Sequence, residues 1–221
     1  METADVQKDV AMFGSKYPRE ALDYYPTIDA DCLGVLLPWF CILFREPERV
    51  WECAAGDGRL LDQLKPLFPN AYGTDLAPKR DDIGVADFLA PFPSKWDAPA
   101  AIVTNPPYVL GDDFVVQAER AAAMYGVNSF FLMRNEFDCA GQSPRSAVFA
   151  GRFYRGKHVL RWRPRWVEGS TGSPRHNYAW YHFGPARSAY EVEPYIRYLN
   201  RPAKRNDRNS NEGLSIPAHA E

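Results

Sequence analysis

The chain has 221 residues, of which 46% are hydrophobic and 24% are charged, and its formal net charge is −2 at pH 7. This composition is ordinary for a globular protein, and the length is enough for one domain with a sizeable core. No stretch approaches the roughly 18 to 20 apolar residues of a membrane span, and the first residues lack the apolar core of a signal peptide. We therefore expect a cytoplasmic protein.

The cysteines and histidines do not form a recognisable framework. The cysteines are widely separated, without a C-x-x-C pair, and the histidines show no zinc-ligand spacing relative to them. We expect reduced thiols, no disulfide bond and no structural metal. The residues are Cys32, Cys41, Cys53, Cys139, His158, His176, His182 and His219.

The first half of the chain reads as a series of short strands after a helical start. Residues 1–22 are polar and mixed, and we expect an arm before the main domain. A buried helix is predicted over 27–44, with Thr27 as its N-cap and Pro38 as a kink. Residues 49–58 predict a strand that turns through glycines, and 59–68 an amphipathic helix. Further strands are predicted over 70–77, 83–90 and 100–105.

In the second half, helices and strands alternate and then give way to two consecutive strands. We predict a helix over 112–126, a strand over 127–137 and a helix over 143–153. Strands over 157–166 and 177–184 follow without a long helix between them. The pattern predicts an α/β domain over 23–199 with a mainly parallel sheet and an antiparallel C-terminal hairpin at one edge. The tail, 200–221, is polar and charged, and we expect it to be disordered.

A glycine-containing turn follows the first predicted strand, in "ECAAGDGRLL" (52–61). Gly56 and Gly58 allow a sharp turn and a close approach to a ligand, although a purely structural turn would use them too. Asp75 closes the next strand and suits a ribose diol, and Asp87 with Phe88 follows at the next strand end. Since ligands bind at the carboxyl ends of parallel strands, these acids indicate a shared cofactor site.

The next predicted strand ends in the motif Asn105-Pro106-Pro107-Tyr108, here called the NPPY motif. Two prolines remove two backbone donors and fix two φ angles. The Asn105 amide oxygen and the Pro106 carbonyl would form a pair of acceptors, and Tyr108 offers a flat ring. Such a set matches a planar group with an NH2, for example the edge of adenine. The alternative is a Pro-Pro turn with a core tyrosine.

The order and spacing of "ECAAGDG", Asp75, "ADF" and "NPPY" resemble class I S-adenosylmethionine-dependent methyltransferases. They resemble most the N6-adenine DNA methyltransferases, of the small type encoded by phages and prophages. The resemblance covers about residues 22 to 185, and "DYYPT" (23–27) is similar to the upstream cofactor-binding segment of that family. It implies the Rossmann-like class I methyltransferase fold, S-adenosyl-L-methionine as cofactor and DNA as partner.

The resemblance also implies roles for individual residues. The NPPY residues Asn105, Pro106, Pro107 and Tyr108 would form the catalytic set, with Tyr108 stacked on a flipped base. Cys53 and Ala54 stand where many relatives have a proline. The implied cofactor-binding residues are Tyr25, Pro26, Thr27, Glu52, Cys53, Ala54, Gly56, Asp57, Gly58, Asp75, Leu76, Asp87, Phe88 and Asn105.

Positive charge gathers in residues 152–175, which hold seven basic residues and one acidic residue. That segment carries +6, so the rest of a chain of net charge −2 carries −8. In "RWRPRW" we expect three arginines on one face of a strand and Trp162 and Trp166 on the other. The predicted nucleic-acid contacts are Arg161, Arg163, Arg165, Ser173, Arg175 and His176. The alternative is a solvated edge strand whose arginines discourage strand pairing.

Other functions fit parts of this pattern. An RNA adenine-N6 methyltransferase would share the motifs, and relatives that methylate a glutamine amide in proteins also carry the NPPY motif. A non-catalytic nucleic-acid-binding subunit would share the fold, although an intact NPPY motif disfavours it. The core elements use most of the chain, so little remains for a target-recognition domain. We therefore expect short or relaxed sequence specificity.

Overall fold

A computed structural model of the chain describes residues 26–43, 49–91, 98–139, 141–171, 173–188 and 193–202. The predicted arm over residues 1–22, Tyr25 and the predicted tail beyond residue 202 lie outside the described residues. Within the described part of the chain, no helix is both long and apolar enough to cross a membrane.

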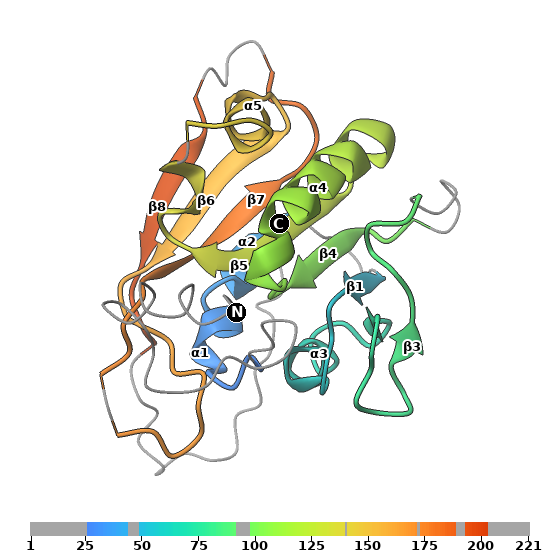
Figure 1. The fold of residues 1–221 in the computed structure, drawn as a ribbon, viewed down its shortest axis with the longest axis vertical. Coiled ribbons are helices and arrows are strands. Elements are labelled where there is room, and N and C mark those ends of the chain that lie inside the picture. Colours follow the sequence, from blue (N-terminus) through green and yellow to red (C-terminus); the bar gives the residue numbers. More distant parts are fainter. Residues whose placement is uncertain are drawn as a thin grey trace, which may run out of the picture.

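One eight-stranded sheet forms the centre of the molecule (Figure 1), with the strand order β3-β2-β1-β4-β5-β7-β6-β8. Strand β7 runs antiparallel to its neighbours β5 and β6, and the other neighbouring pairs are parallel. The strands are β1 (Val50–Glu52), β2 (Tyr72–Asp75), β3 (Gly84–Val85), β4 (Ala101–Thr104), β5 (Asn128–Arg134), β6 (Tyr154–Leu160), β7 (Tyr178–Phe183) and β8 (Tyr195–Leu199). This mainly parallel α/β sheet confirms the predicted fold class.

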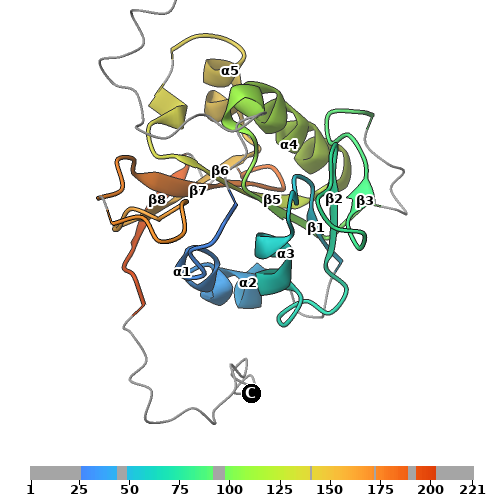
Figure 2. The same cartoon turned by 60° about the horizontal axis from the view of Figure 1, so that its bottom comes forward.

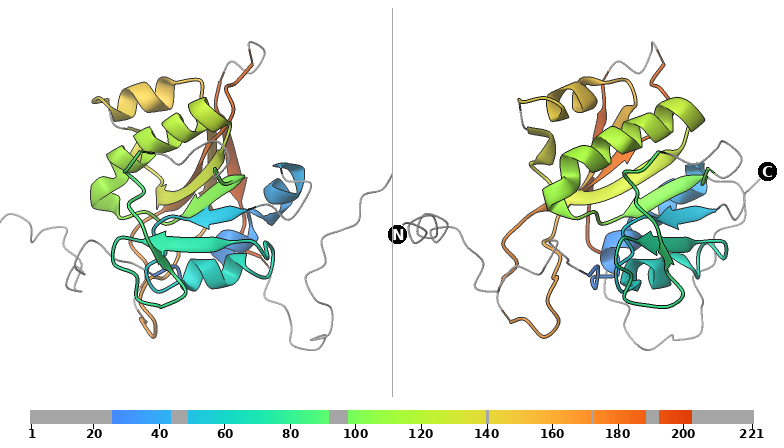
Figure 3. Two further views of the ribbon diagram at one scale, coloured as in Figure 1. Left: turned by 90° about the vertical axis from the view of Figure 1, so that its right-hand side faces the viewer. Right: turned by 45° about the vertical axis from the view of Figure 1, so that its right-hand side comes forward.

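Helices cover both faces of the sheet, as Figures 2 and 3 show. Helices α4 and α5 lie on one face, and α1, α2 and α3 lie on the other. The helices are α1 (Asp31–Gly34), α2 (Leu37–Leu43), α3 (Arg59–Leu64), α4 (Gly111–Tyr125) and α5 (Arg145–Ala150), with short 3-10 turns at Tyr108–Leu110 and Phe137–Cys139.

The central strand β5 explains why the sheet is covered on both faces. Phe130 and Leu132 are fully buried in the core cluster on the side of α1 to α3, and Phe131 and Met133 are fully buried in the cluster on the side of α4 and α5. A strand buried on both faces has a continuous apolar sequence instead of an alternating one. Only the last residue of β5, Arg134, is exposed.

The predicted helix over 27–44 is divided in two, and its cap and its break both differ from the prediction. The chain leaves the helix at Val35 and re-enters it at Leu37, so that Pro38 lies in the first turn of α2. Proline is tolerated there because its missing N–H would be unpaired anyway, whereas inside one long helix its ring would clash with an earlier carbonyl. The N-cap of α1 is Ala30, not Thr27.

The C-terminal strands β6 and β7 form the predicted antiparallel pair, but not at the edge of the sheet. Strand β7 lies inside the sheet, between β5 and β6, and the edge is formed by β8, which the sequence did not indicate. Strand β6 ends at Leu160, so "RWRPRW" is not a strand. Pro164 lacks the N–H that a ladder needs and restricts the residue before it. The alternation in exposure is nevertheless present: the three arginines are exposed, and Trp162 and Trp166 pack against the core.

Candidate active site

A cavity lies at the carboxyl edge of the sheet, where the segments after β1, β2, β3 and β4 meet. Parallel strands place their carboxyl ends at one edge, which brings residues together from distant parts of the sequence. Ten of the residues predicted as site residues line this cavity: Cys53, Ala54, Asp75, Leu76, Asp87, Phe88, Asn105, Pro106, Pro107 and Tyr108.

Asp75 joins the ends of β1 and β2. One carboxylate oxygen, Oδ2, accepts a hydrogen bond from the Gly56 N–H at 2.8 Å, and Oδ1 accepts one from the Ala77 N–H at 2.8 Å. Two ionised carboxylate oxygens offer about four lone-pair sites, so acceptor capacity remains for a ligand. Beside Asp75, the Leu76 side chain is 59% exposed and lines the cavity, which suits an apolar ring.

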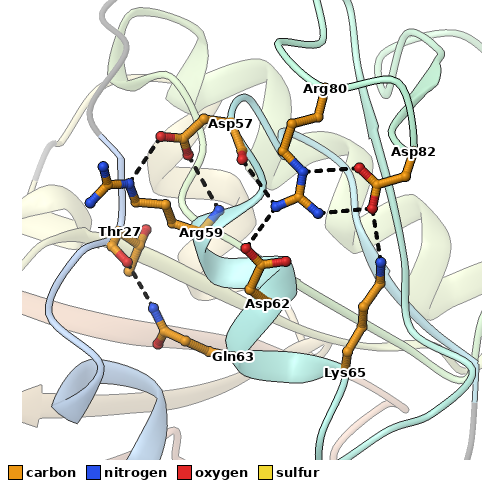
Figure 4. Close-up of polar contacts among 8 residues, drawn as sticks. All are labelled: Thr27, Asp57, Arg59, Asp62, Gln63, Lys65, Arg80 and Asp82. Carbon is orange, nitrogen blue, oxygen red and sulfur yellow. Dashed lines mark hydrogen bonds and ion pairs between the residues drawn. The ribbon is translucent and has the colours of Figure 1, made fainter.

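The glycine turn between β1 and α3 is contacted by Arg80, which lies in the loop between β2 and β3 (Figure 4). Gly58 has φ +80°, and a Cβ added there would lie 2.5 Å from Nη1 of Arg80. Arg80 donates to the Asp57 carbonyl at 3.3 Å and pairs with Asp62 at 2.7 Å and Asp82 at 2.8 Å. These carboxylates raise the pKa of Arg80 above its ordinary range. Glycine is therefore favoured at position 58 by its positive φ, and a side chain there would also displace the Arg80 guanidinium.

Glu52, at the end of β1, is a buried acid with an unused oxygen. It is 2% exposed, and its Oε2 has no hydrogen-bond partner among the described residues. Burial raises the pKa of Glu52 well above its ordinary value, as it does for the neighbouring Cys53 thiol. Glu52, Gly56, Asp57 and Gly58 do not line the cavity, and the Gly56 N–H contacts the lining residue Asp75.

The segment that follows β3 forms another wall of the cavity. Asp87 is exposed, and its Oδ1 accepts from the Leu89 N–H at 2.8 Å, which ends β3 in a turn. The Phe88 ring is 3% exposed and lies 4.8 Å from the ring of Phe114. Buried Gln117 on α4 donates to the carbonyls of Phe88 and Ala90, and thereby fixes this wall to the helix.

The NPPY motif follows β4 directly, and its residues are buried or half-buried. The Tyr108 hydroxyl donates to Oδ1 of Asn105 at 3.0 Å. An amide oxygen has two lone pairs and can accept two hydrogen bonds. The motif thus presents a polar amide and an aromatic ring to the same cavity.

The upstream segment lies apart from the cavity. Thr27 is 4% exposed, and its carbonyl accepts from Gln63 of α3 at 2.8 Å, while Pro26 is half-buried. Arg201 pairs with Asp29 at 3.2 Å and Asp31 at 2.6 Å and thereby attaches this segment to the end of β8. The predicted cofactor contacts of Pro26 and Thr27 remain predictions.

The segment between β6 and β7, residues 161–177, is here called the basic loop. Its Glu168 pairs with Arg59, the first residue of α3, at 3.5 Å. Its Trp166 ring lies 4.9 Å from Tyr178, and Tyr178 lies 6.1 Å from Tyr108. The basic loop therefore reaches from the glycine turn to the rings beside the NPPY motif. Its predicted nucleic-acid contacts Arg161, Arg163, Arg165, Ser173, Arg175 and His176 are exposed.

Several residues at the cavity were not predicted from the sequence. Val109 and Leu110 directly follow the NPPY motif, and their position after it was the available signal. Phe114 belongs to the first turns of α4, and Ala86 and Leu89 flank Asp87 and Phe88; their apolar side chains do not stand out in the sequence. All five line the cavity.

Metal binding is not indicated in the described ranges, which contain no group of three or more histidine, cysteine or acidic side chains placed to hold an ion. Cys32, Cys53 and Cys139 are free thiols.

No protein-family model matches the chain, and no curated protein sequence does. Solved structures match in fold. A Listeria monocytogenes protein assigned as a class I S-adenosylmethionine-dependent methyltransferase superposes with a TM-score of 0.54 at 14% identity, over 79% of this chain and 65% of that one. A Pyrococcus horikoshii protein assigned as an RNA methyltransferase has a TM-score of 0.51 at 17% identity, over 80% and 94%.

The M protein of the type I restriction enzyme EcoKI gives a TM-score of 0.51 at 11% identity, over 81% of this chain and 49% of that protein. Identities this low establish the fold alone. The chain thus has the Rossmann-like fold of class I methyltransferases, as the strand order and the cavity at the carboxyl edge indicate.

Proposed function

We propose that this protein transfers a methyl group from S-adenosyl-L-methionine to the N6 amino group of adenine in DNA. The observation that carries the proposal is the NPPY motif at the end of β4, which lines one cavity together with Asp75, Leu76 and Asp87. Methyltransferases among the structural neighbours support the reaction class and the cofactor, although not the substrate.

The residues at the cavity fit S-adenosylmethionine. Asp75 would accept from the ribose hydroxyls with the lone pairs that its backbone contacts leave over. The exposed Leu76 and the wall at Asp87 and Phe88 would enclose the flat adenine of the cofactor. When bound, the cofactor supplies a methyl group on a positively charged sulfur, which is an electrophile for the target nitrogen.

The NPPY motif would activate the target amine. An exocyclic adenine amine is a poor nucleophile because its lone pair is delocalised into the ring. Asn105 Oδ1 and the Pro106 carbonyl would accept its two hydrogens, which favours a pyramidal nitrogen with an available lone pair. Tyr108 would stack on the base and keep the nitrogen in position. The Tyr108 hydroxyl donates to Oδ1 of Asn105 at 3.0 Å and thereby orients the Asn105 amide.

DNA is proposed over RNA because the motifs and their order resemble the DNA adenine methyltransferases, and the positive charge of the basic loop suits either nucleic acid. A protein glutamine amide would also fit two acceptors. Short or relaxed sequence specificity is part of the proposal.

The test is to incubate the full chain with methyl-labelled cofactor and, in parallel, with DNA, RNA of the same sequence and a protein mixture. Each product is digested and the methylated unit is identified by mass spectrometry. N6-methyladenine in the DNA sample is expected, and its absence from a parallel reaction with Asn105→Ala would tie it to the motif. Label only in RNA adenine or in glutamine would replace the proposed substrate, and no label in any sample would contradict the reaction.

A further inference from the structure

We propose that Arg134, Arg163, Arg175 and His176 form a cationic strip beside the NPPY motif that binds the backbone phosphates of the substrate strand. This inference rests on the proposed function, because it describes how the substrate of that site would be held. It adds Arg134, which lies outside the basic segment of the sequence, and it divides the arginines of that segment into two groups.

Arg134 is placed beside the NPPY motif by the register of the sheet. It is the last residue of β5 and pairs with Tyr178 of β7. Directly paired residues on neighbouring strands point to the same face, so the Arg134 side chain is on the face of Tyr178. The Tyr178 ring in turn lies 6.1 Å from the ring of Tyr108. Arg134 and the proposed base-stacking ring of Tyr108 are therefore both neighbours of Tyr178.

The charge of Arg134 is available to a ligand. Its side chain is exposed, and within the described residues it makes no ion pair. An exposed arginine without an ion pair destabilises the folded protein only slightly. Its guanidinium suits a phosphate because it presents a planar fork of donors.

The end of the basic loop brings the remaining members of the strip together. Arg163 donates to Oδ1 of Asn177 at 3.0 Å and to the Pro174 carbonyl at 3.2 Å, so neutral acceptors orient it without cancelling its charge. The Asn177 carbonyl accepts from the Asn135 N–H at 3.0 Å, which fixes the end of the loop next to the residue that follows Arg134.

The electrostatics of His176 agree with this placement. Although His176 is exposed, partial desolvation of its ring and the neighbouring Arg134, Arg175 and Arg163 lower its pKa, and the opposing acidic neighbour is Glu136. Three arginines against one carboxylate leave a positive surface, and His176 supplies a ring and a hydrogen-bonding nitrogen within it.

Arg161 and Arg165 belong to a different surface. The Arg161 guanidinium donates to Oδ1 of Asn200, beyond β8, at 3.3 Å. Arg165 donates to the Ser170 carbonyl at 2.6 Å and lines a second cavity with Asp29 and Asp31. Arg201 lines the same cavity and pairs with both carboxylates, so the charges there balance and leave no net positive surface. We therefore expect Arg161 and Arg165 to contribute less than the strip to binding the substrate strand.

The experiment measures binding of the full chain to a fluorescent oligonucleotide across a series of salt concentrations, using single-stranded DNA, duplex DNA and RNA of one sequence. Arg134→Gln is compared with Arg120→Gln, which removes the same charge from an exposed residue of α4. Each lost phosphate contact should reduce the slope of log K against log salt by about 0.9 on a duplex and about 0.7 on a single strand.

We expect Arg134→Gln to reduce the slope by about one contact and Arg120→Gln to leave it unchanged. A double variant, Arg163→Gln with Arg175→Gln, should reduce it by more than the equally charged double variant Arg161→Gln with Arg165→Gln. Three results would each overturn the strip. The first is an equal slope for Arg134→Gln and wild type, and the second is an equal loss of slope in the two double variants. The third is a wild-type protein that binds none of the oligonucleotides. Thermal unfolding of each variant checks that these exposed substitutions leave the fold intact.

The strip and the proposed function can fail separately. Product analysis of wild-type protein is made on the same oligonucleotides. Methylated adenine together with an unchanged slope in Arg134→Gln would refute the strip and leave the methyltransferase in place. A reduced slope without methylated adenine would refute the proposed function and leave the strip as a nucleic-acid surface. The three oligonucleotides show which nucleic acid the strip prefers.

Discussion

The two sides of the cavity are built by different interactions. On the side of β1 to β3, charged side chains surround the glycine turn: Arg80 pairs with Asp62 and Asp82, and Lys65 also pairs with Asp82. On the side of β4 to β7, aromatic rings surround the NPPY motif, with Tyr178 between Tyr108 and Trp166. Ion pairs surround the first side. Ring packing and the hydrogen bond between Tyr108 and Asn105 order the NPPY motif on the second side, where the ion pair of Arg145 with Asp112 lies farther along, between α5 and α4.

This difference matches the ligands that we propose for the two sides. Exposed ion pairs contribute about 0–1 kcal/mol each, so the network around Arg80 acts mainly by orienting the turn where the cofactor would be held. The aromatic side presents the Tyr108 ring and the Asn105 amide to the cavity, which would suit a flat base. If the two sides are separate in function, substitutions on one should change cofactor affinity and substitutions on the other should change turnover.

The largest separation is expected from Asn105→Ala. Loss of a transition-state acceptor should reduce kcat by about two orders of magnitude or more, while cofactor affinity stays close to that of wild type. Steady-state kinetics on adenine-containing DNA and calorimetry with the cofactor measure the two effects. Near wild-type turnover would mean that the NPPY motif is only a turn.

Asp75→Ala should produce the opposite separation. Charge-assisted bonds to the ribose are worth about 1.5–3 kcal/mol each, so cofactor affinity should fall by at least about tenfold. Because Asp75 also accepts from Gly56 and Ala77, part of the loss could come from a displaced turn. Asp75→Asn controls for this, since its amide oxygen can still accept one of these bonds. Unchanged affinity in a folded Asp75→Ala protein would contradict the ribose contact.

Two variants of Tyr108 separate its ring from its hydroxyl. Tyr108→Ala removes stacking on the base, worth about 1–3 kcal/mol, and should lower turnover on DNA. Tyr108→Phe keeps the ring and removes the hydroxyl with its bond to Asn105, worth about 0.5–1.5 kcal/mol. If both variants lose the same activity, the ring has no role beyond carrying the hydroxyl.

The site residues that could be predicted are those whose position is indicated by neighbouring residues in the sequence. Asn105 to Tyr108 and the glycines at 56 and 58 are adjacent in sequence to predicted strands, and parallel strands bring their ends together, so their shared location could be predicted. Arg80 had no local signal, because its role depends on a contact with Gly58 across the sheet edge.

The same limit applies to the C-terminal half. Strand β8 pairs with β6, although β7 lies between these two strands in the sequence. No local sequence pattern therefore identified β8 as the edge strand. Arg134 ends an apolar strand far from the basic segment, and only the β5–β7 register brings it to Tyr178. The break before Pro38 depended on where the proline falls in a helical turn, and both a kink and a break were compatible with the sequence.

The smallest expected effect concerns Glu52, the buried acid at the boundary of the two sides. Its pKa is raised in the folded protein by burial, from an ordinary value of 4.5. The folded protein therefore holds the Glu52 proton more tightly than the unfolded chain does. The resulting stabilisation is fully present below about pH 4.5 and is lost as the pH rises toward the raised folded value.

Glu52→Gln should remove this dependence, because the amide stays neutral at every pH. Near neutral pH the variant should unfold at a temperature higher than wild type by about 2–4 °C for each 1 kcal/mol that is regained in a chain of this size. At acidic pH, where Glu52 is protonated in both states, the two proteins should unfold together. Thermal unfolding followed from acidic to neutral pH measures the difference. A constant gap between the proteins over that range would mean that folding does not raise the pKa of Glu52.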